Sequence, residues 1–594
     1  MRPRRLALAG AIGTSLLIGI SAGNVLPAVA THGGDTEVTV GSNDLIFSQN
    51  KQNEPAVAID PAHPNVIAAG ANDNIDMEAC NAGDPTDCPF TEGVGGSGVY
   101  FSFDSGHTWT QPTYTGYSAR GCLGDPNPAV TNDPCVPSPA GPIGTLPRYF
   151  EAGLVSDGDP AVAFGPRPGS DGDFAWSNGS RLYYVNLVAG FPGSGALKGD
   201  EGLAVSRTDD VSAAAGGINT GWMAPVILSK QASATFSDKE QVWVDNAESS
   251  DFFGNVYVCY AKFQGFGAAP MTVAVSRDGG TSWSNKSVSP AHNVAPSRWG
   301  QSGCTIRTDS RGVVYVFYEQ FSNPDFFFPP PGTNLMVRSF DGGTSWTRPV
   351  AINKVVDPCY ALQFDGGGRR CVQDGIGGSR NDLAAAPSVS IANGAPTGAG
   401  ATNELVLTWA GFDAGGAEHV YVRWSTDGGE TWSSPATIEQ SGDRGYYSAP
   451  ALSPDGKDLY LVYNAFTTPF RTDTTSARGL VGVVLHADIG TGGAPTNWTA
   501  LHRGSAGDPR ASAQNNVVLG FLGDYVYAAA TNDYGVAVWN DVRNGATCPA
   551  VDAWRAQVQT SLSLTGRPAI QQACSPTFGN TDIFAGSFAD PNVP

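Results

Sequence analysis

Ser276-Arg-Asp278-Gly-Gly280-Thr-Ser282-Trp283 is one of four copies of the pattern Ser-x-Asp-x-Gly-x-Thr/Ser-Trp, and the others span 102–109, 339–346 and 425–432. Each copy follows a run of alternating apolar residues. An Asp carboxylate accepts backbone N–H bonds within a tight turn, and glycine adopts the positive φ that such turns require. The pattern therefore predicts four hairpin turns, each with a tryptophan that begins the next strand and packs back over the hairpin. The aspartates are given a structural role there: Asp104, Asp278, Asp341 and Asp427.

The repeat extends beyond the turns and predicts the fold. Each unit opens with an apolar strand, often after a proline, and these strands are expected at 54–60, 159–164, 240–245, 303–308, 386–391, 449–453 and 523–528. A second strand follows, a third leads into the turn, and a fourth begins at the tryptophan. Four antiparallel strands per unit form a propeller blade, so we predict an all-β, seven-bladed β-propeller with long disulfide-bearing loops.

Three of the seven units are irregular, because units 2 and 6 carry degraded turns and unit 7 carries none. A six-bladed propeller therefore stays open as the alternative. Segment 36–40 is a candidate strand that adds to the last blade and locks the ring. Because the blades bury their faces only against neighbours, we interpret residues 31–594 as a single domain. Blade boundaries are expected near residues 110, 235, 290, 355, 438 and 510.

The first 30 residues are typical of a secretory signal peptide. Arg2, Arg4 and Arg5 form a basic start, an apolar stretch follows at 6–22, and 28–30 read Ala-Val-Ala, a cleavage site of the A-x-A kind. The sequence therefore predicts a secreted, extracellular protein with no membrane span. The formal net charge of −21 disfavours nucleic acid and anionic lipid as partners.

The chain has ten cysteines, which together with a signal peptide indicate disulfides rather than metal ligation. Proximity in the sequence or on neighbouring predicted strands suggests the pairs Cys80–Cys88, Cys122–Cys135, Cys259–Cys304, Cys359–Cys371 and Cys548–Cys574. Ten cysteines allow many other connectivities, so the pairing stays open at this point.

Residues just before each innermost strand line the mouth of the central channel, where propellers commonly bind ligands. These positions are polar, aromatic and rich in carboxylates, as a sugar site requires, although any solvated rim is polar. They are Asn53, Glu54, Asp157, Asp159, Asp238, Lys239, Glu240, Arg298, Trp299, Gln301, Arg380, Asn381, Asp382, Arg444, Tyr446, Tyr447, Asp524 and Tyr525.

The four turns resemble the Asp-box, or BNR repeat, of the sialidase-like β-propellers. Segment 445–456 is similar to the sialidase segment in which Gly-Tyr-Ser leads an inner strand towards a Pro-Asp-Gly turn. In that family the tyrosine is the nucleophile of a retaining glycosidase. The resemblance implies that Tyr447 attacks, that Glu240 polarises its phenol and that Asp159 protonates the leaving oxygen.

Sialidases also hold the sugar carboxylate with three arginines, and Arg298, Arg380 and Arg444 precede inner strands 4, 5 and 6. Asn53, Glu54, Trp299 and Tyr446 complete the expected substrate-binding set. The first blade departs from the family, because Gln52-Asn53-Glu54-Pro55 stands where sialidases have Tyr/Phe-Arg-Ile-Pro.

Two function classes follow from these residues. One is a secreted, exo-acting glycoside hydrolase on extracellular glycans, and the alternative is a non-catalytic propeller that binds carbohydrate or protein at the cell surface. We expect a monomer with a glycan or glycoconjugate ligand and no cofactor. Calcium is the one metal considered, because carboxylates cluster in the first long loop at Asp73, Asp76, Asp84 and Asp87, although solvated acidic loops are more common.

Secretion and oxidation of the cysteines are testable by mass spectrometry. We expect the mature chain to begin near Thr31 and most cysteines to resist a thiol-alkylating label until they are reduced. Intact mass with and without the label measures both properties. Ten labelled cysteines in the non-reduced mature protein would contradict the expectation.

Overall fold

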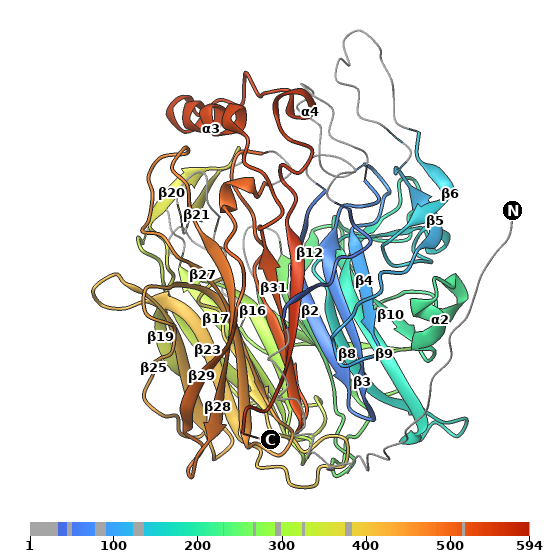
Figure 1. The fold of residues 1–594 in the computed structure, drawn as a ribbon. Coiled ribbons are helices and arrows are strands. Elements are labelled where there is room, and N and C mark those ends of the chain that lie inside the picture. The colour runs from blue at the N-terminus through green and yellow to red at the C-terminus, as the bar shows by residue number, and fades with distance from the viewer. Residues whose placement is uncertain are drawn as a thin grey trace, which may run out of the picture. The chain divides into compact units, whose positions relative to one another are not determined.

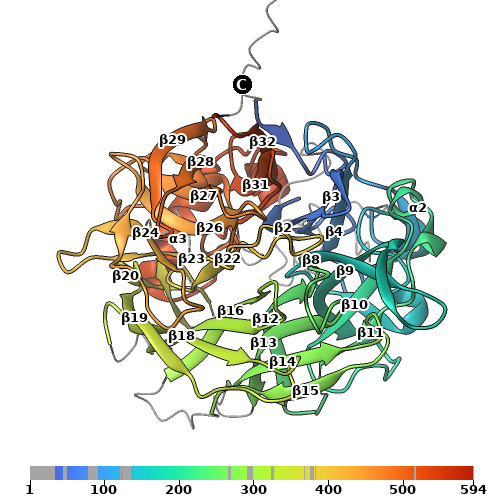
Figure 2. The ribbon, with the colours of Figure 1, turned by 90° about the horizontal axis from the view of Figure 1, so that it is seen from below.

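Seven antiparallel sheets surround one axis in the computed structural model (Figure 1, Figure 2). The structure describes residues 34–43, 50–77, 91–120, 122, 136–229, 231–264, 269–290, 299–322, 327–366, 368–372, 374, 380, 383–513 and 517–592. All of these lie within one unit of the chain, His32–Val593. The seven-bladed propeller predicted from the repeats is confirmed, and the six-bladed alternative is wrong.

The first four blades follow the chain in order, from the innermost strand outwards. Blade 1 contains β2 (Gln52–Asp60), β3 (His63–Asp73) and β4 (Ser97–Ser102); blade 2 contains β8 (Ala161–Pro168), β9 (Phe174–Gly190), β10 (Gly202–Thr208) and β11 (Val226–Ile227), with β7 (Leu154–Ser156) also on β9. Blade 3 contains β12 (Thr235–Val244), β13 (Val256–Gln264), β14 (Met271–Ser276) and β15 (Ser284–Ser287); blade 4 contains β16 (Trp299–Thr308), β17 (Val314–Ser322), β18 (Pro331–Ser339) and β19 (Val350–Val356).

The remaining three blades complete the ring. Blade 5 contains β22 (Ser388–Ile391), β23 (Leu405–Phe412), β24 (Glu418–Ser425) and β25 (Ala436–Thr437); blade 6 contains β26 (Arg444–Leu452), β27 (Asp458–Phe466), β28 (Leu480–Ile489) and β29 (Pro495–Arg503). Blade 7 contains β30 (Tyr527–Ala530), β31 (Tyr534–Asp541), β32 (Asp582–Ala589) and, as its outer strand, β1 (Thr36–Glu37).

Strand β1 closes the ring by joining the start of the chain to its last blade. Thr36 pairs with Ala585 and Glu37 with Phe584, both antiparallel. Each innermost strand also contacts the innermost strand of the next blade, including β30 of blade 7 against β2 of blade 1. The predicted locking segment at 36–40 therefore forms a strand at its first two residues, and the seven blades form a continuous circle.

All four repeated turns share one hydrogen-bond geometry. The serine hydroxyl donates to the aspartate two residues later, and the aspartate accepts the backbone N–H four residues after itself at 2.7–2.9 Å. The indole N–H groups of Trp283 and Trp346 donate to the glycine carbonyl of their own turn at 3.1 and 3.2 Å. Their rings also pack against the apolar cluster shared with the preceding blade, so these turns belong to the contacts between blades.

Arginines connect three of these turns from blade to blade. Arg207 of blade 2 donates to the Gly279 carbonyl of blade 3 at 3.2 Å, and Arg277 of blade 3 donates to the Gly342 carbonyl of blade 4 at 2.7 Å. Arg338 of blade 4 donates to a blade 5 turn in the same way, at 2.9 Å. Hydrogen bonds from a charged donor are stronger than neutral ones, so these contacts reinforce blades 2 to 5.

Insertions between strands add short elements to the blades, and several of these elements lie at one end of the propeller (Figure 1). They comprise β5 (Tyr114–Ser118), β6 (Ser138–Ile143), β20 (Ala361–Phe364), β21 (Arg369–Val372), α2 (Val211–Ala215), α3 (Pro549–Ser561), α4 (Ile570–Ala573) and the short 3₁₀ helices η1 (Phe150–Ala152), η2 (Asn219–Gly221) and η3 (Pro509–Ala511). The side chain of Gln559 in α3 exchanges two hydrogen bonds with the backbone of Phe364 in β20, at 2.7 and 2.9 Å. Among the described helices, none is both long and apolar enough to cross a membrane.

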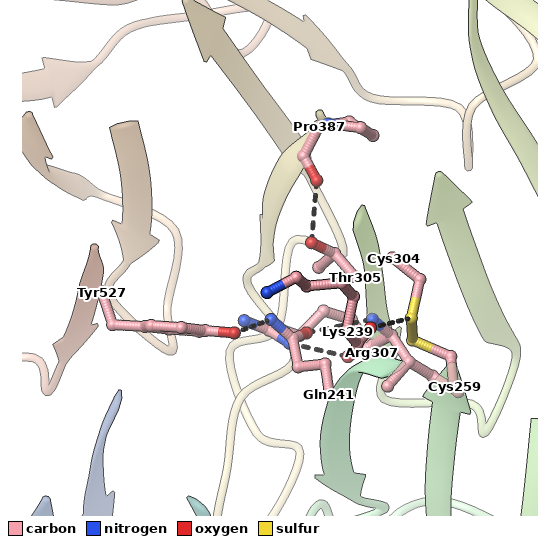
Figure 3. Close-up of a disulfide and its surroundings, with 9 residues drawn as sticks. Lys239, Gln241, Cys259, Cys304, Thr305, Arg307, Pro387 and Tyr527 are labelled. Carbon is pink, nitrogen blue, oxygen red and sulfur yellow. Dashed lines mark hydrogen bonds between the residues drawn. A yellow bond between two sulfur atoms is a disulfide. The ribbon is translucent and has the colours of Figure 1, made fainter. Parts of the chain in front are cut away.

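Three predicted disulfides are confirmed: Cys259–Cys304, Cys359–Cys371 and Cys548–Cys574. The first joins β13 of blade 3 to β16 of blade 4 (Figure 3). The other two close loops within the insertions. The pairings of Cys80 with Cys88 and of Cys122 with Cys135 fall outside the described residues.

Removal of one turn carboxylate tests the structural role of the turns. Asp278→Ala leaves the backbone N–H groups of Thr281 and Ser282 without their acceptor, so we expect the free energy of unfolding to fall by about 1–2 kcal/mol. Urea denaturation measures the change. Asp251→Ala, at an exposed aspartate, is the matched control and is expected to change stability by less than about 0.5 kcal/mol. Equal stability of the two variants would contradict the role.

Candidate functional site

The innermost strands begin with a recurring strained position. Glu54, Asp159, Lys239 and Tyr447 all have positive φ, between 48° and 57°, although none is glycine. In β2, β12 and β26 this residue lies at a bulge where the register with the next strand shifts. Such backbone costs on the order of 1–3 kcal/mol per residue and persists only where the surroundings hold it, most often at functional sites. The repeat therefore directs four chemically active side chains to one level of the channel.

Blade 7 has a glycine at this level, and close packing requires it. Gly523 has φ +83°, and a Cβ atom there would lie 2.7 Å from the backbone N of Glu54. This close approach of Gly523 to Glu54 places the next residue of blade 7, Asp524, beside the side chains of Glu54 and Lys239. Asp524 and Lys239 belong to the rim positions identified from the sequence, but sequence reasoning gave neither residue a chemical role.

Lys239 is the centre of the cluster. Its Nζ lies 2.6 Å from Asp524 Oδ2, 2.8 Å from Asp159 Oδ2 and 3.5 Å from Glu54 Oε1. Asp238 is a fourth carboxylate, at 3.9 Å. These groups come from blades 7, 2, 1 and 3, so one ammonium connects four blades across the point where the ring closes.

The crowding of carboxylates divides them into charged and protonated groups. Burial acts against ionisation, but Lys239 lowers the pKa of Asp159 to about 2 and holds the pKa of Asp524 below its ordinary value. Burial and the charge of Asp159 raise the pKa of Glu54 well above its ordinary value. Burial would lower the pKa of Lys239, yet the surrounding carboxylates raise it, so the ammonium stays charged.

Tyr447 is paired with Asp524, not with the expected Glu240. Its phenol donates to Asp524 Oδ1 at 3.1 Å, and its side chain is only 3% exposed. Tyr446 packs against it with ring centroids 4.1 Å apart and donates its own hydroxyl to the Arg380 carbonyl at 2.9 Å. Tyr446, expected to bind substrate, therefore contributes to the core and positions its neighbour.

Glu240 faces the same small cavity as Tyr447 but has different chemistry. The cavity holds about 60 Å³ and is also lined by Lys239 and Asp524. Glu240 is 5% exposed, and neither carboxyl oxygen has a hydrogen-bond partner among the described residues. Burial, followed by the charge of Asp159, raises the pKa of Glu240 well above its ordinary value. A carboxylic acid that keeps its proton is a proton donor and cannot serve as a base, which reverses the expected role.

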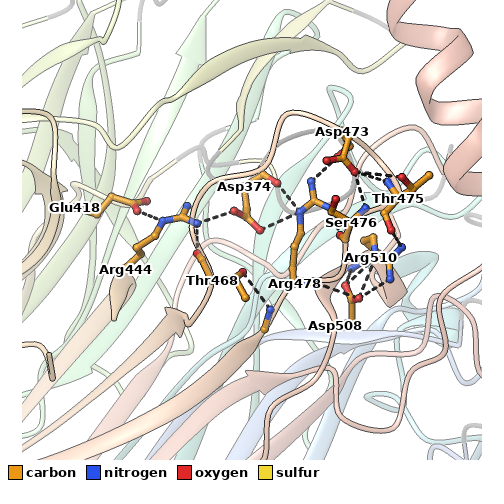
Figure 4. Close-up of polar contacts among 11 residues, drawn as sticks. Asp374, Glu418, Arg444, Thr468, Asp473, Thr475, Ser476, Arg478, Asp508 and Arg510 are labelled. Atoms are coloured by element: carbon orange, nitrogen blue, oxygen red, sulfur yellow. Dashed lines mark hydrogen bonds and ion pairs between the residues drawn. The ribbon is translucent and has the colours of Figure 1, made fainter. Parts of the chain in front are cut away.

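Two of the three predicted arginines occupy different places. The Arg380 guanidinium lies 4.0 Å from the Phe521 ring centroid, and its charge helps to lower the pKa of Asp524. Arg444 instead donates to Glu418 at 2.5 Å and to Asp374 at 2.7 Å (Figure 4). Since two carboxylates already neutralise Arg444, it is not available for a substrate carboxylate in this arrangement. Arg298 lies outside the described residues.

The remaining predicted binding residues hold the inner strands. Asn72 donates to Asn53 Oδ1 at 2.9 Å and to Glu54 Oε2 at 2.7 Å, which fixes the first blade beside the cluster. Trp299 begins β16, where its backbone pairs with Ser322.

Lys51 is a buried ionisable residue that the sequence analysis did not identify. Burial and the charge of Arg380 lower the pKa of Lys51 to about 7.

Carboxylates in the first loop do not support the calcium interpretation. Asp73 accepts from Ser42, Gln52 and Tyr100, and Asp76 accepts from Arg120 and Thr145. Protein donors thus satisfy both carboxylates. Asp84 and Asp87 lie outside the described residues.

A second group has ligand atoms close enough for a metal ion. Asp458, His486 and Asp488 of blade 6 place one such atom each within 4.8 Å of the others. His486 Nε2 already lies 3.1 Å from Asp458, and Asp488 accepts from Asn497 and Asn592. These hydrogen bonds give the three side chains a structural role within blade 6.

Comparisons with known proteins yield solved structures of low similarity and no family. No family model matches the sequence, and no curated protein matches it. Similar solved structures include the Hadza microbial sialidase Hz136, at 14% identity and a TM-score of 0.37, over 70% of this chain and 63% of that one, so the chain spans less than two thirds of that protein. An α-L-arabinofuranosidase, Arb93A from Fusarium graminearum, is 12% identical with a TM-score of 0.35, over 72% and 93% of the two chains.

A third similar structure is a polysaccharide lyase of family PL25, an ulvan lyase, at 9% identity and a TM-score of 0.39, over 83% and 92% of the chains. Likeness at this level says nothing about the chemistry of this chain. The fold and the site together define a seven-bladed β-propeller with a buried ionisable cluster in its channel.

Replacing Glu240 tests its protonation. Because the folded-state pKa lies above the usual 4.5, Glu240 favours folding at low pH, and that contribution is lost as the pH rises from about 4.5 towards the raised pKa. Glu240→Gln removes this loss. We expect the free energy of unfolding of Glu240→Gln, relative to the unmodified protein, to increase between pH 5 and pH 8 by up to about 1.4 kcal/mol per pH unit.

Urea denaturation at several pH values measures this difference. Glu248→Gln, at an exposed glutamate, serves as the control and is expected to follow the unmodified protein throughout. A Glu240→Gln curve parallel to that of the unmodified protein would show that Glu240 is ionised in the folded state.

Proposed function

We propose that this chain is a carbohydrate-active propeller, and specifically a glycoside hydrolase that acts through Tyr447. The observation that carries the proposal is the pairing of the Tyr447 phenol with the Asp524 carboxylate in a cavity that also holds the protonated Glu240. Cleavage of a glycosidic bond needs a nucleophile, a group that takes its proton and an acid for the leaving oxygen. These three residues supply the three groups.

The proton positions define the roles. The Tyr447 oxygen attacks the anomeric carbon while its proton passes to Asp524, which Lys239 keeps anionic at neutral pH. Glu240 gives its proton to the leaving oxygen and then acts as the base that activates water in the second step. Asp159 is ionised beside Lys239 and therefore orients the cluster; it does not donate the proton.

Substrate entry requires movement of the segments that line the cavity. A volume of about 60 Å³ holds about two waters, whereas a sugar ring is several times larger. Segment 383–388 and residues 447–448 form part of the wall and must move for a sugar to reach the phenol. We place the reaction outside the cell, because three disulfides are stable in an oxidising compartment.

A second candidate is a propeller that binds a glycan or a protein without reaction. Two observations favour it: Tyr447 and Asp524 are both buried, and Arg444 is held by Glu418 and Asp374. In that case the Lys239 cluster serves ring closure, and a ligand binds at the surrounding loops.

Hydrolysis of a panel of chromogenic glycosides and glycans separates the two candidates. For a hydrolase, Tyr447→Phe is expected to lower kcat by about a thousandfold or more, because the variant lacks the nucleophile. Glu240→Gln should impair substrates with poor leaving groups far more than activated ones, since good leaving groups need no proton.

Tyr446→Phe is the matched control, because it keeps the ring that packs against Tyr447 and removes only the hydroxyl that donates to the Arg380 carbonyl. Turnover by Tyr447→Phe at the unmodified rate would overturn the catalytic assignment. Glycan binding without turnover by the unmodified protein would favour the second candidate.

A further inference from the structure

A row of polar side chains divides the channel into two cavities. Gln241 of blade 3 donates to the Tyr527 hydroxyl of blade 7 at 2.6 Å, and its carbonyl oxygen accepts from Arg307 of blade 4 (Figure 3). Gln241 and Tyr527 line both cavities. The upper cavity contains Tyr447 and Glu240. The lower cavity follows the later residues of the same innermost strands and is a separate compartment.

The lower cavity is the larger and has mostly apolar walls. It holds about 250 Å³ and is lined by residues of all seven innermost strands, and the apolar ones include Ala58, Phe164, Trp243, Ile391, Leu452 and Ala529. A cavity of roughly 150 Å³ with apolar walls is enough for benzene. The lower cavity therefore has room for an aromatic ring that carries one polar substituent.

Arg307 is an unneutralised cation in this cavity. No carboxylate of the described residues lies within ion-pair distance of its guanidinium, which is stacked 4.6 Å from the Trp243 ring centroid. Among the described residues, the Arg307 guanidinium donates through Nη1 alone, to Gln241 and to the Ile306 carbonyl, so Nε and Nη2 remain available as donors. The other charged lining residue, Asp533, lies on the exposed turn between β30 and β31.

We propose that the lower cavity binds a small apolar carboxylate, with the carboxylate on Arg307 and the apolar part between the innermost strands. The planar guanidinium offers two parallel N–H donors, which match the two oxygens of a carboxylate. Burial costs a lone guanidinium its hydration, and a carboxylate ligand would restore both charge balance and hydrogen bonds. This site lies apart from Tyr447 and does not depend on the proposed hydrolase activity.

Fluorine NMR with 4-fluorobenzoate tests the site on the full chain. We expect saturable binding, and we expect 4-fluorobenzamide, which has the same shape without the charge, to bind about tenfold more weakly or worse. Arg307→Met should weaken benzoate binding by a similar factor, whereas Arg307→Lys should retain part of it. Tyr447→Phe should leave it unchanged, because that residue lines the other cavity.

The comparison of benzoate with benzamide requires no variant, so the test holds even if Arg307→Met fails to fold. Equal binding of 4-fluorobenzoate and 4-fluorobenzamide would overturn the proposal. So would the absence of 4-fluorobenzoate binding at about 10 mM, a concentration at which even a weak ligand binds. Loss of benzoate binding in Tyr447→Phe would also overturn it, because it would place the probe in the upper cavity.

Discussion

Ring closure is the constraint on which this structure depends. Each blade buries its two faces only against its neighbours, so an open ring would expose the apolar faces of its terminal blades. The backbone closure is short, because β1 pairs with β32 through Thr36 and Glu37 alone. The Lys239 cluster adds a second closure at the axis, where one ammonium holds carboxylates from blades 7, 1 and 2. Removal of one partner from a buried ion pair of this kind strongly destabilises the fold, because the other partner is left as an uncompensated buried charge.

The same cluster accounts for the strained backbone of the candidate site and for the different protonation states of its carboxyl groups. Left-handed backbone at Glu54, Asp159, Lys239 and Tyr447 brings the side chains inward from blades 1, 2, 3 and 6. Crowding then separates their protonation states, so that an anionic Asp524 and a protonated Glu240 border one cavity. Groups with separated proton affinities are the usual basis of acid and base chemistry at neutral pH. The proposed chemistry therefore depends on residues that also hold the ring closed.

The fold was predictable from the sequence because its signals are local. Turn chemistry and two-residue alternation recur in each unit, and the predicted strand at 240–245 falls within β12, Thr235–Val244 but for its last residue. The strand begins earlier than the sequence predicted, at Thr235, because its pairing with β13 continues on the N-terminal side of the bulge between Asp238 and Gln241. Three disulfides were also found from sequence proximity and strand neighbourhood.

The site was only partly predictable, because charge partners depend on contacts between distant segments. Arg380 and Arg444 are expected from the sequence to have the same role, yet Arg444 is paired with Glu418 and with an insertion carboxylate, Asp374. Nothing near Arg444 in the sequence indicates that Asp374 returns to it. Likewise, the choice of Asp524 over Glu240 as the partner of Tyr447 depends on how blade 7 meets blade 6. Sequence pattern identified the level of the site, and packing between blades decided the roles within it.

The single ammonium at the axis also limits how this protein can diverge. Its partners are encoded as far apart as residues 54 and 524, yet they share one counter-charge. A change at any one of them alters the charge balance of the others, so single substitutions are disfavoured while compensated pairs are tolerated. Relatives of this chain should therefore retain the whole set or replace it together, and joint variation at these positions would mark the propellers that share this centre.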